Sequence, residues 1–470
     1  MTDKSSSRYA PGGPSAERPF HLVSEDATRA AAPLQADLAI IGGGMVGMSL
    51  AIACSEHGIK TALIEAEPAP ALTDRGYDGR SSAIAYGSQQ VLKAIGVWDL
   101  LKDQAQPILD IRVTDGGGDQ RDARRPGGVS PFFVHYSHRD LAGDAAPPQS
   151  GDARPVDAPP FGYIVENRVS RVAMFERLQA CPNVTHIAPA TALSFKLDAE
   201  RALVSLSDGR QVEAALVVAA DGRHSALRGF AGIGISESDY RQSAIVCTVV
   251  HEKPHHGVAH EHFLPAGPFA MLPMTDDRDD DGRIRHRSSI VWTEDPRLVP
   301  MLLALDDDAF GAEIERRFGL TLGRVRPLGP RFSYPLKLLV AEKYLADRLV
   351  LVGDAAHGIH PIAGQGFNLG VRDVAALAEV LVDARRLGQD IGSPLVLERY
   401  ARWRRFDNLL LVGVTDGLTR LFSNDLPPLR LARDLGFALF NKLRPVKRLA
   451  MRHAMGLVGN LPKLVRGEPL

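Results

Sequence analysis

The stretch that decides the fold is Asp37-Leu-Ala-Ile-Ile-Gly-Gly-Gly-Met-Val-Gly47. A short apolar run ends in three glycines, and residues 45–57 then repeat apolar side chains at helical spacing. A second apolar run, 60–65, follows the helical pattern. This order predicts a strand, a tight turn, a helix and a second, parallel strand, joined by a right-handed crossover.

The glycines of this stretch form a GxGxxG pattern, Gly42 to Gly47. Gly42 permits the tight turn, Gly44 lets the backbone approach a pyrophosphate, and Gly47 lets helix and strand pack closely. A phosphate there would meet the unpaired N–H groups at the start of the helix. Glu65 ends the second strand, where a carboxylate can accept both hydroxyls of an adenosine ribose. Its charge disfavours a 2′-phosphate, so we expect FAD or NAD rather than NADP at this site.

Two further apolar strands, 216–220 and 348–352, each end in an acid beside a glycine. The pairs are Asp221-Gly222 and Gly353-Asp354, and Arg80 lies just after the first unit. Because the carboxyl ends of parallel strands meet at one edge of a sheet, we expect these acids to lie at the edge where ligands bind.

Composition excludes several classes of protein. The 470 residues are 45% hydrophobic and 24% charged, with 55 basic and 56 acidic residues, so a strongly basic nucleic-acid binder is excluded. Three scattered cysteines predict neither a disulfide framework nor a zinc site, and we expect no metal. No apolar run reaches the ~18 residues of a transmembrane helix. The first 35 residues resemble neither a secretory signal nor a transit peptide, so we expect a cytoplasmic protein.

The same motifs, in this order, carry a resemblance to a known family. Besides those above, they include Gly353-Asp-Ala-Ala-His357, His360-Pro-Ile-Ala-Gly-Gln-Gly366, Asn368-Leu-Gly370 and Arg372-Asp373. The sequence resembles the class A FAD-dependent aromatic hydroxylases related to p-hydroxybenzoate hydroxylase, and among them the ubiquinone-biosynthesis hydroxylases. The resemblance covers residues 36–114 and 161–470.

The resemblance implies an α/β protein. It has a Rossmann-like FAD-binding domain, a substrate domain built on a mixed β-sheet, and a C-terminal helical segment. We expect a flexible tail over 1–35, the FAD-binding domain over 36–235 with an insertion at 115–160, the substrate sheet over 236–331, the rest of the FAD-binding domain over 332–390, and a C-terminal helical segment over 391–470.

The resemblance also implies roles for single residues. Gly42, Gly44 and Gly47 would hold the FAD pyrophosphate, and Glu65 the adenosine ribose. Asp354 would bond the ribityl chain, Asp221 would help bind FAD near the transient nicotinamide site, and Arg80 would lie near the cofactor. Gly353, Gly366 and Asn368 complete the predicted cofactor set. NAD(P)H would bind only transiently, since no second GxGxxG unit is present.

The residues of the loop Gly364-Gln365-Gly366 by themselves indicate contact with a planar ligand that carries negative charge. Two glycines bring backbone N–H groups close to a planar ligand, and the helix that follows would stabilise negative charge on the flavin. Pro361 would form a rigid wall. His360 is either a proton partner for a phenol or a packed wall residue, and the sequence leaves both interpretations open.

The C-terminal segment 425–470 carries nine Lys/Arg residues against three acids, with leucines and phenylalanines between them. This pattern suits an amphipathic segment on an anionic membrane, on the inner face, or on a partner in a ubiquinone-biosynthesis complex. The alternative is a helical hairpin packed on its own core.

The leading hypothesis is a monooxygenase that uses NAD(P)H and O2 to hydroxylate a polyprenyl phenol in ubiquinone biosynthesis. Alternatives are a hydroxylase of a soluble aromatic compound, a flavin-bearing subunit of a biosynthetic assembly, and a nicotinamide-dependent dehydrogenase. The ring position, the tail length, the choice of NADH or NADPH and the oligomeric state are not encoded in any motif.

Overall fold

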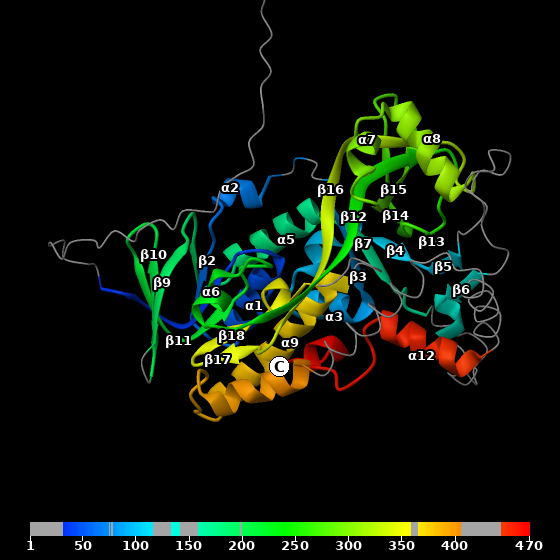
Figure 1. Ribbon diagram of the computed structural model, residues 1–470. Coiled ribbons are helices and arrows are strands. Elements are labelled where there is room, and N and C mark those ends of the chain that lie inside the picture. The colour runs from blue at the N-terminus through cyan, green and yellow to red at the C-terminus, as the bar shows by residue number, and fades with distance from the viewer. Residues whose placement is uncertain are drawn as a thin grey trace, which may run out of the picture. The chain divides into compact units, whose positions relative to one another are not determined.

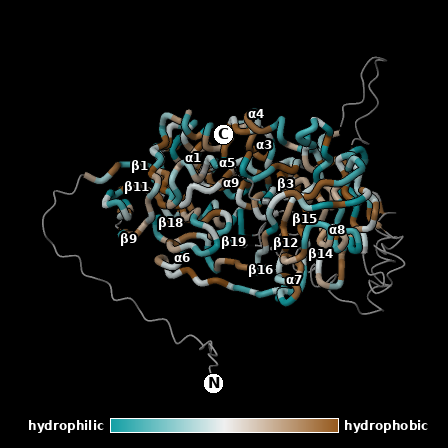
Figure 2. Tube along the Cα trace, turned by 90° about the horizontal axis from the view of Figure 1, so that it is seen from above, coloured by the Kyte–Doolittle hydropathy of each residue, from teal (hydrophilic) through white to brown (hydrophobic). Residues whose placement is uncertain are grey.

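The computed structural model describes residues 32–470 except 75, 77–78, 116–132, 142–157, 198–199, 359–364 and 406–442 (Figure 1). These residues form three sheets and the helices that cover them. In the two views, β1, β11 and β18 lie on one side and β12, β14 and β15 on the other (Figures 1 and 2).

The first sheet is built around the predicted strand–turn–helix–strand unit, which is confirmed. β1 (Leu34–Ile41) pairs in parallel with β2 (Thr61–Ile64), and α1 (Met45–Ser55) connects them. Two more parallel strands extend the sheet, β11 (Gln211–Ala219) beside β1 and β18 (Leu349–Leu351) beside β11. Its other strands are β8 (Val184–Ile187), β9 (Ala192–Leu197), β10 (Ala202–Leu206) and β17 (Leu345–Ala346).

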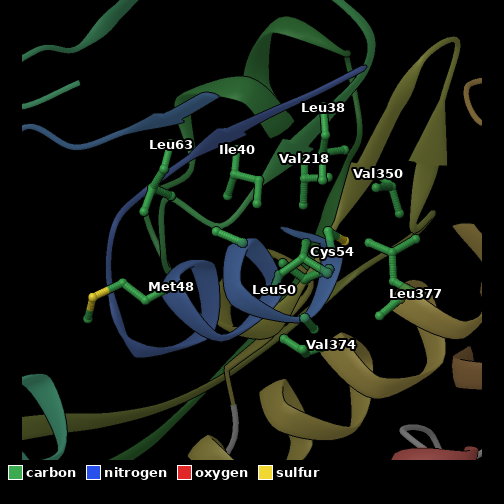
Figure 3. Close-up of a cluster of buried hydrophobic side chains, with 14 of the residues drawn as sticks. Leu38, Ile40, Met48, Leu50, Cys54, Leu63, Val218, Val350, Val374 and Leu377 are labelled. Atoms are coloured by element: carbon green, nitrogen blue, oxygen red, sulfur yellow. The ribbon is translucent and has the colours of Figure 1, made fainter. Parts of the chain in front are cut away.

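Helix α1 is buried from Gly47 to Ser55, so its sequence is apolar almost all round. Figure 3 shows why: Leu50 and Cys54 lie between the strand residues Leu38 and Ile40 and the side chains of α9 (Gln365–Arg386). Every one of these strand and α1 side chains is fully buried. Because helices cover this parallel sheet, its strands are apolar on both faces.

The second sheet is mixed, as predicted for the substrate domain. Its order is β19-β16-β12-β15-β14-β13-β5-β6, with β5 parallel to β13 and the other pairs antiparallel. The strands are β5 (Asp110–Asp115), β6 (Phe133–Ser137), β12 (Ile235–His251), β13 (Val258–Leu264), β14 (Gly267–Arg278), β15 (Ile284–Glu294), β16 (Val325–Ala341) and β19 (His357–Gly358). The short β19 joins this sheet directly to the loop that ends β18.

A small third sheet, β3 (Ser81–Ala85), β7 (Gly162–Glu166) and β4 (Gln106–Ile108), has the order β3-β7-β4. The remaining described helices are α2 (Ala69–Leu72), α3 (Tyr86–Ala94), α4 (Trp98–Leu101), α5 (Asn167–Gln179), α6 (Ala226–Phe230), α7 (Val299–Leu303), α8 (Asp307–Phe318), a helix over 394–405, and α12 (Arg444–Ala454).

Two expectations need correction. Residues 115–160 are not wholly an insertion outside the fold, because β6 pairs with β5 and extends the second sheet. The chain after residue 395 is not helical to its end. Beyond α12, Gly456 and Gly459 adopt positive φ angles of 78° and 97°, and Pro462 precedes only a short turn over Lys463–Arg466. Most of the described part of 391–470 is helical, and the domain boundaries themselves stay predictions.

A buried carboxylate, Asp373 of α9, ties three segments together. Its Oδ2 atom accepts the N–H of Gly353 at 2.9 Å and lies 2.6 Å from Nε2 of His357 in β19. Its Oδ1 atom accepts Nε–H of Arg404 at 2.8 Å. All three side chains are fully buried. Tyr400, one helical turn before Arg404, donates its hydroxyl to the carbonyl of Leu351 at 2.9 Å.

We expect Asp373→Ala to lower the free energy of unfolding by about 3–5 kcal/mol, since it removes the carboxylate that pairs with the fully buried Arg404 guanidinium. Urea unfolding in excess FAD measures this. Asp383→Ala is the matched control on the same helix. Its carboxylate is partly exposed and lies 3.4 Å from Arg399, so its loss should cost no more than about 1 kcal/mol.

The same carboxylate predicts acid sensitivity. Burial alone would raise the pKa of Asp373, but the charges and hydrogen bonds of His357 and Arg404 outweigh burial and hold the pKa at about 2. Because this value lies below the ordinary 3.8, the stabilisation is fully present above 3.8 and is lost as the pH falls through about 2. Equal unfolding midpoints for Asp373→Ala and the wild type would contradict both expectations.

Candidate active site

Four parallel strands end at one edge, and the predicted cofactor residues follow them. Ile41 of β1 is in register with Ile64 of β2 and with Ala219 of β11, and Ala219 is in register with Leu351 of β18. Gly42 and Glu65 come next along the chain, and Asp221 and Gly353 follow two residues after Ala219 and Leu351. This register agrees with the expectation that the acid–glycine pairs lie at the carboxyl edge of the sheet, and their roles at the cofactor stay predictions.

The glycine turn has the geometry that its sequence predicts. Gly42 has φ +107°, and a side chain there would collide with the carbonyl oxygen of Ala220. A side chain at Gly47 would collide with the carbonyl oxygen of Gly42, so strand and helix touch at this point. At Gly44, by contrast, no atom lies within 4 Å of an added Cβ. Packing therefore does not require Gly44, and the open space beside it fits a pyrophosphate.

Glu65 lies against the same turn. Its Oε2 accepts the N–H of Gly43 at 2.5 Å and its Oε1 accepts that of Glu67 at 2.8 Å. The carboxylate is therefore fixed at the point predicted for the adenosine ribose, and its contact with a ribose stays a prediction.

The two acid–glycine pairs carry carboxylates that lack full protein partners. Asp221 accepts the N–H of Leu227 at 3.3 Å through Oδ2, but its buried Oδ1 has no hydrogen-bond partner among the described residues. Asp354 is exposed although its neighbours Gly353 and Ala355 are buried. A buried orphan oxygen and an exposed carboxylate at one sheet edge fit hydroxyl groups of a bound dinucleotide.

Helix α9 is described from Gln365, and Gly366 has open space around its Cα. The predicted residues His360, Pro361 and Gly364 lie outside the described residues, so their catalytic roles and that of Gln365 stay predictions. Asn368 is buried, and its amide donates to the carbonyl of Ala83 and accepts the N–H of Ala85, each at 2.8 Å. It therefore fixes β3 on α9, and any contact with the cofactor stays a prediction.

A cavity of about 650 Å³ lies between this edge and the second sheet. The segment after Asp221-Gly222 lines one part of it, through Arg223, His224 and Arg228, and Arg80 and Ser81 line another. The second sheet supplies a wall of mostly small and apolar side chains: Ala244, Val246, Pro268, Ala270, Leu272, Val291, Thr293 and Leu336. Arg80 thus lies at the cavity, directly before the strand that Asn368 positions.

Sequence reasoning missed two charged residues of this region. Asp373 was quoted only as part of the resemblance, although a lone acid within the apolar face of α9 is a signal for a buried, paired carboxylate. Glu261 of β13 also lines the cavity, and no motif marks it.

Gly44→Val should weaken FAD binding by about tenfold or more, because the added methyl groups occupy the space where the backbone approaches the pyrophosphate. Its φ of −65° suits any residue, so the thermal midpoint of the FAD-free protein should stay unchanged. FAD titration by flavin fluorescence measures the affinity.

Gly229→Val is the matched control, since Gly229 also has open space around it and lies on the exposed side of α6. It should bind FAD normally. A Gly44→Val protein with normal FAD affinity would show that the backbone at Gly44 does not approach the pyrophosphate.

Comparisons with known proteins agree with this geometry. The chain is 51% identical to the ubiquinone hydroxylase UbiL of Rhodospirillum rubrum, over 93% of this chain and 94% of that protein. It is 36% identical to the 3-demethoxyubiquinol 3-hydroxylase of Escherichia coli, over 90% of this chain and 98% of the relative. The crystal structure of p-nitrophenol 4-monooxygenase PnpA from Pseudomonas putida matches the fold with a TM-score of 0.71, at 20% identity, over 91% of this chain and 99% of that one.

A family model described as FAD binding domain matches residues 35–405. The chain therefore belongs to the FAD binding domain family, and it is a FAD-dependent monooxygenase.

Proposed function

We propose that this monooxygenase hydroxylates the aromatic ring of a polyprenyl phenol in ubiquinone biosynthesis, with NAD(P)H as reductant and O2 as oxygen source. The observation that carries the proposal is the apolar cavity of about 650 Å³ beside the cofactor edge, in a chain 51% identical to a ubiquinone hydroxylase. A phenol ring fits the apolar part of this cavity, where the wall from the second sheet carries mostly small and apolar side chains.

Bound FAD supplies the redox chemistry, namely reduction by NAD(P)H and activation of O2. The protein's own residues do the rest. The wall of the second sheet excludes water from the substrate ring. Asn368 of α9 bonds the backbone of β3 and so keeps β3 in place beside the cavity.

The cavity does not favour a carboxylated substrate. Arg228 is buried and lines the cavity, but its two terminal nitrogens donate to the carbonyls of Ala355 and Arg223 at 2.9 Å. Arg223 donates in turn to the carbonyl of Lys337 at 2.9 Å. Both terminal nitrogens of Arg228 therefore bond the backbone, so this buried guanidinium is a poor anchor for a soluble aromatic acid.

Purified, FAD-loaded protein tests the function with a prenylated phenol that lacks one ring oxygen. We expect the phenol to stimulate NAD(P)H consumption and one atom of ¹⁸O2 to enter its ring, as mass spectrometry would show. Turnover of p-hydroxybenzoate alone would favour the soluble-substrate alternative. No NAD(P)H consumption with any phenol would favour a flavin-bearing assembly subunit.

Helix α12 supports a membrane-docking role for the described part of the C-terminal segment. Within the described residues, no helix is both long and apolar enough to cross a bilayer. However, Leu443, Val446 and Leu449 form an exposed apolar strip, 43%, 45% and 59% exposed, on a helix with four Lys/Arg residues and no acid. Such a helix suits an anionic lipid surface.

Residues on the buried face of α12 pack in a cluster with residues that line the cavity. Met451 and Met455 pack in a cluster with Ala83 and Leu272, and both of the latter also line the cavity. A helix that docks on lipid would therefore lie close to the apolar wall that receives a prenylated substrate. The lipid surface and any biosynthetic complex remain parts of this proposal.

Leu449→Asp should reduce sedimentation with liposomes that contain anionic lipid by about tenfold, because it removes roughly 1.5–3 kcal/mol of apolar burial and adds a repelled charge. Ile284→Asp is the control, since Ile284 is 58% exposed on the β14–β15 hairpin. Equal liposome binding by the two variants would show that α12 does not contact the lipid.

A further inference from the structure

Glu261 lies at the middle of β13, in a row of side chains that runs across four strands. It pairs in register with Ala270, Ala270 with Val291, and Val291 with Val246. All four side chains line the cavity. The row therefore presents one carboxyl group among three small apolar side chains on the wall of the cavity.

Burial along β13 shows the same orientation. The other six residues of the strand are buried, and only Glu261 is half-buried, because its side chain opens into the cavity. No hydrogen bond or ion pair to this carboxyl is recorded within the described part of the chain. A carboxyl group without a partner in an apolar environment is costly, so its presence here points to a ligand that supplies the missing partner.

Burial in the protein brings the pKa of the Glu261 carboxyl close to neutral pH. Burial raises the pKa of Glu261 from 4.5 to about 7, and no neighbouring charge contributes to the shift. On the adjoining strands, its register partners Ala270 and Val113 carry no charge. The remaining ionisable groups of the cavity come from other elements: Arg80, Arg223, His224, Arg228, Glu237, Tyr334 and Lys337.

Most of those groups are already engaged. Glu237 pairs with Lys337 at 3.2 Å, and Arg223 and Arg228 donate to backbone carbonyls. Arg80 also has a protein partner. Of the two carboxyl groups that line the cavity, Glu237 has a partner, whereas Glu261 has no hydrogen-bond or ion-pair partner among the described residues.

Building on the proposed function, we propose that Glu261 is the catalytic base that accepts the hydrogen bond of the substrate's phenolic hydroxyl and takes its proton. In this step the phenolic O–H bond breaks, an O–H bond forms on the Glu261 carboxylate, and the negative charge moves to the substrate oxygen. The ring becomes more electron-rich and so a better acceptor for an electrophilic oxygen atom. The proton leaves Glu261 for solvent after product release.

The test compares Glu261→Gln with the wild type, both as full-length FAD-loaded protein. Loss of a general base predicts a fall in hydroxylation of about 10²–10⁴-fold in kcat, with FAD content and thermal midpoint unchanged. In the wild type, kcat should rise as the pH rises through about 7, because only the ionised carboxylate accepts a proton. Glu261→Gln should lose this limb of the profile, and Glu261→Asp should regain part of it.

Glu213→Gln is the control, since Glu213 lies on β11, outside the cavity lining, and pairs with Arg201 at 2.8 Å. It should keep the wild-type pH profile. Wild-type kcat and pH profile in Glu261→Gln would overturn the proposal.

A binding measurement separates this proposal from the proposed function, because it needs no turnover. Perturbation of the flavin spectrum reports binding of a simple phenol and of its methyl ether. The wild type should bind the phenol about tenfold or more tightly than the ether, as one hydrogen bond to a charged group allows, and Glu261→Leu, which has no acceptor, should bind both equally. Equal preference in wild type and variant would overturn the role of Glu261, whereas an inactive wild type that still shows the preference would overturn only the proposed substrate.

Discussion

The carboxylate of Asp373 is the constraint on which the arrangement of the site depends. It accepts the N–H of Gly353, holds His357 and pairs with Arg404. Gly353 follows the last parallel strand, and its φ of +58° turns the chain out of the sheet. His357 begins the strand that pairs with β16 of the second sheet. One buried charge therefore fixes the turn after β18, the helix that begins at Gln365 and the junction of two sheets.

That junction places the cavity. Strands β12 and β16 pair over most of their length. The end of β16 near Ala341 pairs with β19, and Ile235 of β12 is in register with Ala341. Further along, the two strands carry cavity residues such as Val246 and Leu336. The second sheet thus stands over the carboxyl edge of the first. A ligand at that edge has the mostly apolar wall of the second sheet on one side and the segment after Asp221-Gly222 on the other, an arrangement that can orient a ring.

The sequence predicted the local parts of this site well. The glycine turn, Glu65, Asp221 and Gly353 lie at strand ends, and strand ends can be recognised from apolar runs and glycines alone. The confirmed parallel register brings them together without further information. What the sequence did not predict depends on distant pairing: β6 joins the second sheet from within an apparent insertion, and the partner of Asp373 is Arg404, 31 residues away.

Asp373 and Glu261 show why burial alone does not identify a role. Both are carboxyl groups surrounded by protein, and burial raises the pKa of each. For Asp373, His357 and Arg404 reverse that effect and hold the pKa at about 2, so the group stays ionised and serves as a fixed anchor. For Glu261 nothing opposes burial, the pKa reaches about 7, and the group can exchange a proton near neutral pH. Two carboxyl groups separated in this way can serve structure and proton transfer in one fold, because each environment allows only one of the two tasks.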